Sequence, residues 1–229
     1  MATYVLVHGA YQGGWIWKPV VERLRAAGHV VYAPTLDGCA ERQHLVRAGI
    51  TVATHAEEIA RLLFYEDLRD VVLAGTSAGG MVILKAAEQA RDRIARLAFV
   101  DALALLPGER VDAIVKRPAP NRVGDLTTGP TKEDAANRMF KDLQPALRTW
   151  ALDRITPHPV AALEAPMVAT TFWEQKWKAS VIRCTLAANP PEAHQRRTAE
   201  KLGAPYVEMN TGHYPMLSAP DELTKLLLG

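Results

Sequence analysis

Residues 71–80 read Val71-Val72-Leu73-Ala74-Gly75-Thr76-Ser77-Ala78-Gly79-Gly80, and this stretch decides the fold. Its four leading apolar residues, two of them β-branched, predict a buried strand. Gly75 to Gly79 then fit the pattern G-x-S-x-G, and residues 81–89 have the composition of a helix. A glycine-flanked serine between a strand and a helix is typical of a nucleophile on a sharp turn. The alternative is a serine without a catalytic role in a glycine-rich turn. The predicted strand before Ser77 and the predicted helix after it favour the interpretation as a nucleophile.

The glycines around Ser77 have a steric reason. On a turn this sharp, side chains two residues before or after the serine would collide with neighbouring backbone. The turn leaves the hydroxyl of Ser77 exposed at the positive end of the following helix, where developing negative charge is favoured.

The composition indicates one globular domain without a nucleic-acid partner. The chain has 229 residues, 48% of them hydrophobic, which is enough for a sizeable core in a single domain spanning residues 1–229. The net charge is only +2 with both signs scattered, so the sequence predicts no nucleic-acid partner. Cys39 and Cys184 lie far apart without metal-ligand spacing, which favours two buried free thiols in a reducing compartment.

Other segments bear on cofactors and location. No glycine-rich loop matches a phosphate-binding or dinucleotide fingerprint, so no cofactor or metal is expected. The first strand begins at Thr3 without a preceding charged segment or cleavage site, and no apolar run is long enough to span a bilayer. We therefore expect a cytoplasmic protein without a membrane partner. The oligomeric state stays open, a homodimer included.

Strands and helices alternate along most of the chain. Such alternation predicts an α/β fold with a mainly parallel, doubly wound sheet, and ligand sites in such sheets lie beyond the carboxyl ends of the strands. His8, Ser77, Asp101 and His213 all fall at or just past predicted strand ends. The predicted strands are 3–7, 29–33, 71–74, 94–100, 180–185 and 205–209, and the predicted helices are 17–27, 54–63, 81–89, 193–202 and 220–228.

The alternation of strands and helices is interrupted between residues 107 and 178. This segment is rich in proline, shows two helical pieces at 132–143 and 170–178, and contains no convincing strand. A structureless connection of this length is uncommon in a compact domain, so we expect a helical cap inserted over the site at about 107–178. An earlier polar stretch, which includes Asp37, is expected to be a solvated loop.

Four motifs together resemble one known family. They are His8-Gly9-Ala10-Tyr11-Gln12-Gly13-Gly14-Trp15, Ala33-Pro34-Thr35-Leu36-Asp37-Gly38, the turn at 75–79, and Gly212-His213-Tyr214-Pro215-Met216-Leu217-Ser218. The chain resembles an α/β-hydrolase over nearly its whole length except the cap. More narrowly, it is similar to the small esterases related to plant methylesterases and hydroxynitrile lyases, and to their bacterial relatives.

The resemblance implies roles for individual residues. Ser77 matches the nucleophile and His213 the general base of the family. The backbone N–H groups of Ala10 and Ala78 match the oxyanion hole, one from the loop after the first strand and one from the residue after the nucleophile. His8 matches a position that more often braces this loop by hydrogen bonds than touches substrate.

The acid of the triad departs from the family pattern. The family most often places an aspartate after the strand at 180–185, but residues 186–191 contain no carboxylate. Asp101 follows the neighbouring strand and could bind the Nδ1–H of His213, or it could merely brace the entry to the cap. If neither carboxylate position serves, the site is a Ser–His dyad.

Two further departures bear on the reaction. Thr76 stands where histidine is common in this group. The smaller side chain either leaves more room beneath the turn or changes a hydrogen bond there. Tyr214 follows the candidate catalytic histidine, at the position where the pattern of the hydroxynitrile lyases has lysine. The positive charge that would stabilise departing cyanide is therefore missing, which disfavours the lyase reaction.

Aromatic residues are the candidates for substrate contacts. Tyr11 and Trp15 lie in the loop beside the predicted oxyanion hole. Trp173 and Trp177 are four residues apart and would share a face of a cap helix, where Trp177 is expected to pack and Trp173 is a candidate for substrate contact.

The motifs predict a cofactor-free serine hydrolase acting on a small, largely apolar carboxylic ester or lactone through an acyl-enzyme. A lyase, cyclase or decarboxylase using the same serine, histidine and oxyanion hole is the alternative. A binding module that has lost its chemistry is a third reading, which the intact motifs disfavour.

Overall fold

The core of the molecule is a six-stranded sheet in the order β2-β1-β3-β4-β8-β9, and every neighbouring pair is parallel. The computed structural model describes residues 1–116 and 121–229. This sheet confirms the predicted α/β class. The strands are β1 (Thr3–Val7), β2 (Val30–Tyr32), β3 (Val71–Ser77), β4 (Ile94–Ala102), β8 (Ala179–Cys184) and β9 (Tyr206–Met209).

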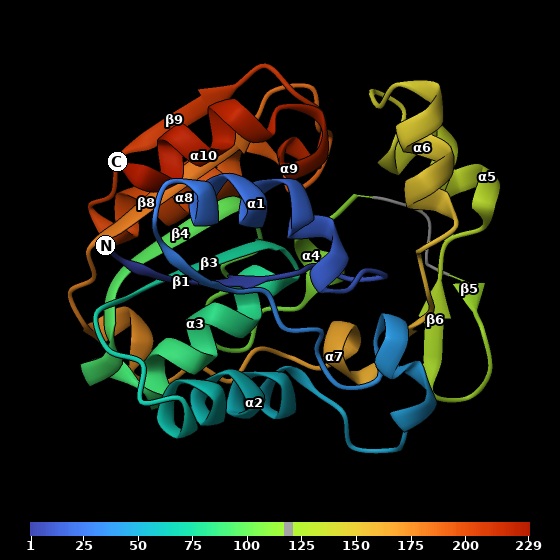
Figure 1. Cartoon of the computed structure of the whole chain (residues 1–229). Helices are drawn as coiled ribbons and strands as arrows, with labels where there is room; N and C mark the ends of the chain where they lie inside the picture. Colours follow the sequence, from blue (N-terminus) through green and yellow to red (C-terminus); the bar gives the residue numbers. More distant parts are fainter. Residues whose placement is uncertain (117–120) are drawn as a thin grey trace.

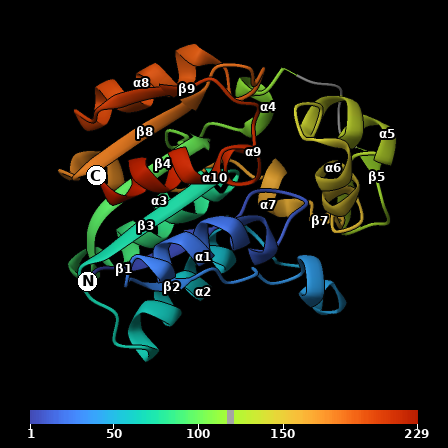
Figure 2. The same cartoon turned by 45° about the horizontal axis from the view of Figure 1, so that its top comes forward.

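Helices cover both faces of the sheet (Figures 1 and 2). α2 and α3 pack together on one face, whereas α1 and α10 lie together on the other. The apolar stripe of α1, formed by Val20, Val21 and Leu24, is buried, as expected for an amphipathic helix on a sheet. The helices are α1 (Lys18–Ala26), α2 (Val52–Tyr65), α3 (Gly79–Gln89), α8 (Glu192–Leu202), α9 (Pro215–Ser218) and α10 (Pro220–Leu228).

The strand order explains where a site can form. The chain passes from β1 outward to β2 and then returns to β3 on the other side of β1. At such a reversal the loops after the two strands diverge and leave a crevice at their carboxyl ends. The loop after β1 and the turn after β3 meet at this point.

Residues 121–159 of the segment between β4 and β8 fold beside the sheet, at the right of Figure 1, and the segment differs in detail from the expectation. It contains a three-stranded sheet in which β6 pairs with β5 and β7 antiparallel, although no strand was expected. These strands have only two or three residues, too few to show alternation. The elements are α4 (Val111–Ile114), β5 (Asn121–Arg122), β6 (Thr127–Gly129), α5 (Lys132–Asp134), the π-helical turn η4 (Ala135–Met139), α6 (Pro145–Leu152), β7 (His158–Pro159) and α7 (Ala161–Glu164).

Two further expectations about loops are wrong. Residues 170–178 form only a 3₁₀ turn, Phe172–Glu174, so Trp173 and Trp177 do not share a helix face. Trp177 instead folds back, with its ring stacked on Phe172 at 5.0 Å and its Nε1 donating to the Phe172 carbonyl. Asp37, expected in a solvated loop, is only 4% exposed because Arg42 and Arg47 pair with its carboxylate.

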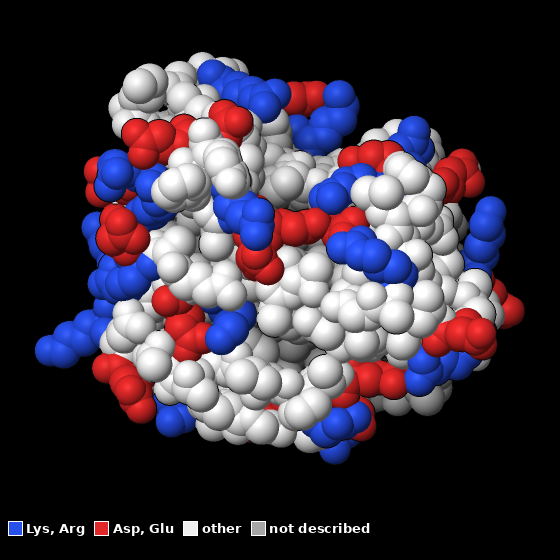
Figure 3. All heavy atoms as spheres, turned by 90° about the horizontal axis from the view of Figure 1, so that it is seen from below, with Lys and Arg blue, Asp and Glu red and all other residues white. Residues whose placement is uncertain are grey.

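The charges of the surface are mixed. On the face in Figure 3, basic and acidic residues alternate without a large area of one sign, in keeping with the small net charge. Within the two described ranges, no helix combines the length and the apolar character needed to cross a membrane.

Candidate active site

Ser77 lies on the turn between β3 and α3 with a backbone φ of 52°. This left-handed conformation is strained for a residue other than glycine and is typical of functional turns. A Cβ on Gly75 would lie 2.6 Å from the carbonyl oxygen of Gly79, and a Cβ on Gly9 would lie 2.6 Å from the Cβ of Ser77. The glycines therefore permit the close approach of backbone that brings the hydroxyl of Ser77 to the surface of a cavity.

Asp101 is turned toward the site by a bulge at the end of β4. In the pairing of β3 with β4, Ser77 lies opposite Ala102, so Asp101 is the extra residue and has a φ of 45°. Its side chain is fully buried. One carboxylate oxygen accepts hydrogen bonds from the backbone N–H of Cys184 at 3.1 Å and from Nε2 of Gln195 at 2.7 Å. Buried charge is tolerated only where such partners satisfy it.

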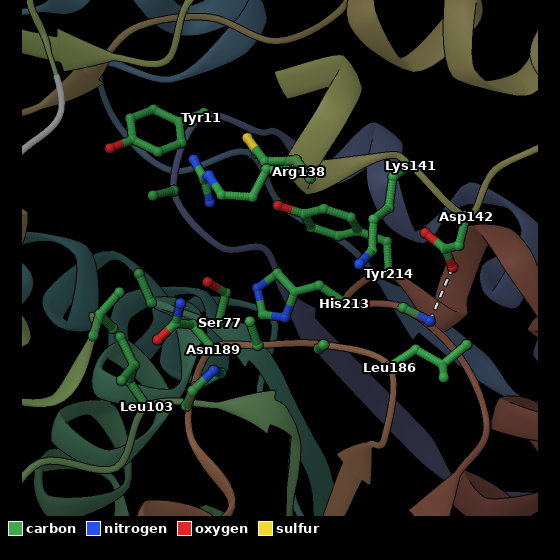
Figure 4. Close-up of a pocket in the computed structure, with 18 of the residues that line it drawn as sticks. Tyr11, Ser77, Leu103, Arg138, Lys141, Asp142, Leu186, Asn189, His213 and Tyr214 are labelled. Atoms are coloured by element: carbon green, nitrogen blue, oxygen red, sulfur yellow. Dashed lines mark hydrogen bonds between the residues drawn. The ribbon is translucent and has the colours of Figure 1, made fainter. Parts of the chain in front are cut away.

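The other carboxylate oxygen of Asp101 contacts Nδ1 of His213 at 2.5 Å. This contact favours the tautomer in which Nδ1 carries the proton and donates to Asp101. Nε2, on the other side of the ring, can then accept a proton. Figure 4 shows the hydroxyl of Ser77 and the ring of His213 facing the same space. The structure thus brings Ser77, Asp101 and His213 together from three strand ends.

A second carboxylate holds the backbone of the histidine loop. Oδ2 of Asp142 accepts a hydrogen bond from the backbone N–H of Gly212 at 2.9 Å, drawn as the dashed line in Figure 4. A Cβ on Gly212 would collide with this carboxylate. Asp142 belongs to the segment inserted between β4 and β8, so that segment contacts the residue next to His213.

Ala10 and Ala78 both line the cavity beside Ser77. His8 lies behind them and is buried, with Nδ1 donating to the Gly9 carbonyl and Nε2 accepting from the backbone N–H of Leu36. Burial lowers the pKa of His8 to about 4, so its ring is neutral near pH 7. His8 therefore braces the loop that carries Ala10, in agreement with the sequence analysis.

The cavity over Ser77 is lined by both apolar and polar side chains, and the side formed by the turn η4 with Lys141 and Asp142 is called the polar wall. The polar residues come mostly from the turn η4 and the residues after it. The apolar lining includes Leu103, Val111, Val115, Leu163 and Leu186, and the polar lining includes Asn137, Arg138, Lys141, Asp142 and Asn189. A small organic molecule with both apolar and polar groups would fit this lining.

The aromatic candidates for substrate contacts separate into two groups. Tyr11 lines the cavity. Trp15 packs edge-to-face on Trp150 with ring centroids 5.3 Å apart, and Nε1 of Trp173 donates to the Leu105 carbonyl. Neither tryptophan belongs to the lining that the described residues form.

Sequence reasoning missed four polar residues of the site. Arg138, Lys141 and Asp142 lie in a segment read as an ordinary cap helix, and Gln195 lies on α8 in a region without any motif. No local pattern marks them, because their position depends on how distant segments pack.

The two described ranges contain no group of three His, Cys, Asp or Glu side chains placed to hold a metal ion. Cys39 and Cys184 are free and buried, and burial raises the pKa of both thiols, which disfavours thiolate chemistry.

Comparison with known proteins identifies the family of this chain. A family model described as "Alpha/beta hydrolase family" matches residues 4–226. The chain is 29% identical to a carbendazim hydrolyzing esterase of Nocardioides sp. (strain SG-4G), over 99% of this chain and 98% of the relative. It is 33% identical to methylesterase 8 of Arabidopsis thaliana over 42% of this chain and 36% of the relative.

Among solved structures, an extracellular α/β-hydrolase from a Paenibacillus species superposes with a TM-score of 0.88. The identity is 23%, and the match covers 100% of this chain and 98% of that one, so this likeness concerns the fold. The resemblance to small plant and bacterial esterases is therefore confirmed. With the matching family model, the parallel sheet and the serine turn at its reversal, the chain belongs to the alpha/beta hydrolase family.

Proposed function

We propose that the protein is a cofactor-free serine hydrolase that cleaves a small carboxylic ester or lactone through an acyl-enzyme. The coarser statement, that it is an esterase-type α/β-hydrolase, rests on its family and on relatives named as esterases. The finer statement rests on the residues around Ser77.

The observation that carries the mechanism is the 2.5 Å contact between Asp101 and Nδ1 of His213. A carboxylate at this nitrogen fixes the tautomer in which Nε2 can accept a proton, and it stabilises the imidazolium that forms. It supports Asp101 as the acid of the triad, in place of the aspartate that the family most often carries after the strand equivalent to β8. The Ser–His dyad is then unnecessary.

The proposed reaction has two halves. Ser77 Oγ attacks the ester carbonyl while Nε2 of His213 takes its proton, and the N–H groups of Ala10 and Ala78 stabilise the oxyanion. His213 then gives the proton to the leaving alkoxide as its bond to the acyl carbon breaks. Water attacks the acyl-enzyme with His213 as the base, and the acid product and free Ser77 are restored.

Pre-steady-state hydrolysis of short p-nitrophenyl esters tests this proposal. We expect a burst of p-nitrophenol equal to the enzyme concentration, and labelling of the wild type by a serine-directed phosphonate. Ser77→Ala should abolish both, with a loss of roughly 10⁴-fold or more in kcat. If no ester of the panel is turned over and no phosphonate labels the wild type, the hydrolase proposal fails and a lyase, cyclase or decarboxylase becomes the better hypothesis.

A further inference from the structure

The polar wall of the cavity contains a fixed cation opposite the nucleophile. We propose that Arg138 is a specificity-determining residue that donates to an uncharged hydrogen-bond acceptor on the substrate, such as a ketone or amide carbonyl remote from the scissile ester. The inference deepens the proposed function, and it adds a polar acceptor to the largely apolar substrate that the motifs predict.

The backbone brings Arg138 to the cavity through the π-helical turn η4. The N–H of Phe140 donates to the carbonyl of Ala135 at 2.9 Å, five residues earlier, which is the hydrogen bond of a π turn. Three consecutive residues of this stretch, Asn137, Arg138 and Met139, line the cavity. Such turns interrupt helices frequently at functional sites. In Figure 4 the side chain of Arg138 extends from this turn toward the space between Tyr11 and the Ser77–His213 pair.

Asp134 fixes the direction of the guanidinium. Nε of Arg138 donates to one carboxylate oxygen of Asp134 at 2.8 Å, and Nη2 donates to the other at 2.5 Å. A two-bonded pair of this kind defines the plane of the guanidinium as well as its position. Nη1 is the nitrogen that does not contact Asp134. The hydrogen bonds that Arg138 donates to Asp134 also raise the pKa of Arg138, so the donor stays charged.

The charges of the wall favour an uncharged acceptor over an anion. Arg138 is paired with Asp134, and Lys141 and Asp142 also line the cavity, so this wall carries both signs of charge. A substrate carboxylate beside the guanidinium would also lie close to Asp134, and repulsion between the two anions would offset part of the attraction to Arg138. A wholly apolar group would cover the guanidinium of Arg138, whose side chain is 35% exposed, without giving Nη1 a partner. A neutral carbonyl oxygen avoids both costs.

Matched ligands can measure this preference without requiring catalysis. Methyl (4-acetylphenyl)acetate and methyl (4-isopropenylphenyl)acetate differ only by an oxygen in place of a CH₂ group, and the 3-substituted pair moves that group around the ring. The 4-carboxyphenyl analogue supplies the anion. Their Kd values for Ser77→Ala, which cannot form an acyl-enzyme, are measured by calorimetry in three backgrounds: Ser77→Ala alone, with Arg138→Met, and with Lys141→Met.

At one ring position, we expect the acetyl ligand to bind Ser77→Ala at least about tenfold more tightly than its isopropenyl partner, the effect of one hydrogen bond to a charged donor. Arg138→Met should reduce the ratio to within about twofold. Lys141→Met, which removes an equal charge from the same wall, should leave it unchanged.

Three results would overturn the inference: no preference for acetyl at either position, a preference that survives Arg138→Met, or tighter binding of the carboxylate than of the acetyl ligand. Hydrolysis of the same esters by the wild type is a separate readout. A binding preference without hydrolysis counts against the proposed function alone, whereas hydrolysis without the preference counts against the role of Arg138 alone.

Discussion

Two aspartates approach the loop of His213, and they should differ sharply in their effect on catalysis. Asp101 contacts Nδ1 of the ring, whereas Asp142 accepts a hydrogen bond from the backbone N–H of Gly212. We predict that Asp101→Asn lowers kcat by roughly 10³–10⁴-fold, because an amide N–H at Nδ1 would favour the wrong tautomer. Asp142→Asn keeps an acceptor for Gly212 and should cost less than about tenfold.

The two aspartate variants are compared by burst kinetics on p-nitrophenyl acetate, with circular dichroism to verify folding. A folded Asp101→Asn with nearly wild-type kcat would remove Asp101 from the triad. The reverse order of effects would point to Asp142 as the acid.

Gln195 acts on the ring only through Asp101. Its Nε2 donates to Asp101 at 2.7 Å and to the Pro190 carbonyl at 3.2 Å, both in a buried environment. We predict that Gln195→Met, similar in length but without the donor, lowers kcat about tenfold, the effect of losing one hydrogen bond to a charged group, while KM stays within about twofold. Steady-state kinetics give this split. A change confined to KM would contradict a positioning role and indicate instead that the substrate cavity has shifted.

The turn between β3 and α3 requires glycine at position 75, and adding a single methyl group there tests this requirement. A Cβ on Gly75 would press against the backbone of Gly79 at 2.6 Å, and backbone cannot move aside as a flexible side chain can. We predict that Gly75→Ala lowers the free energy of unfolding by about 2 kcal/mol or more, from the usual cost of overpacking.

Gly129→Ala in β6 is the matched control, because its nearest neighbour would lie at an ordinary 3.6 Å. Urea unfolding measures both variants. Equal stability of Gly75→Ala and the wild type would mean that the turn relaxes without cost.

The same elements show what sequence can and cannot predict. The strand, turn and helix around Ser77 follow from local rules, because the apolar run, the glycines and the helix start act within about twenty residues. The three-stranded sheet of the inserted segment could not be predicted, since strands such as Asn121–Arg122 are too short for any periodicity. The π turn that presents Arg138 was read as ordinary helix, because propensities do not distinguish the two.

Side-chain pairing that no sequence motif marks explains the remaining differences. Asp37 looks like a loop residue in the sequence, but arginines five and ten residues later fold over its carboxylate and bury it. Asp101 was recognised as a candidate because it ends a strand. Its partner Gln195, 94 residues away, carries no local signal.

Buried histidines connect distant parts of the molecule. His158 reaches from β7 into the core, where its ring lies 5.8 Å from that of His55 on α2 and 3.4 Å from the sulfur of Cys39. Burial, the largest cause in each case, lowers the pKa of His8, His55 and His158. The fold therefore holds these rings neutral, and a proton added to any of them opposes folding.

Acid should therefore destabilise the protein already at pH values above those at which carboxylates titrate. His194 can be used to test this expectation. Burial lowers its pKa from 6.5 to about 4, while Nε2 accepts from the backbone N–H of Ala104. Between these values the unfolded chain binds a proton that the folded chain does not. The contribution to stability is thus complete above pH 6.5 and is lost as the pH falls to 4. It amounts to roughly 3 kcal/mol for a shift of this size.

We predict that the free energy of unfolding in urea falls steadily from pH 7.5 to 4.5, and that His194→Gln, which can still accept from Ala104, makes this fall shallower by on the order of 3 kcal/mol. His44→Gln, at a solvent-exposed histidine, is the control and should leave the pH dependence unchanged. If His194→Gln keeps the full wild-type dependence, His194 does not resist protonation in the folded protein. If His44→Gln also flattens the curve, the fall reflects total charge instead of burial.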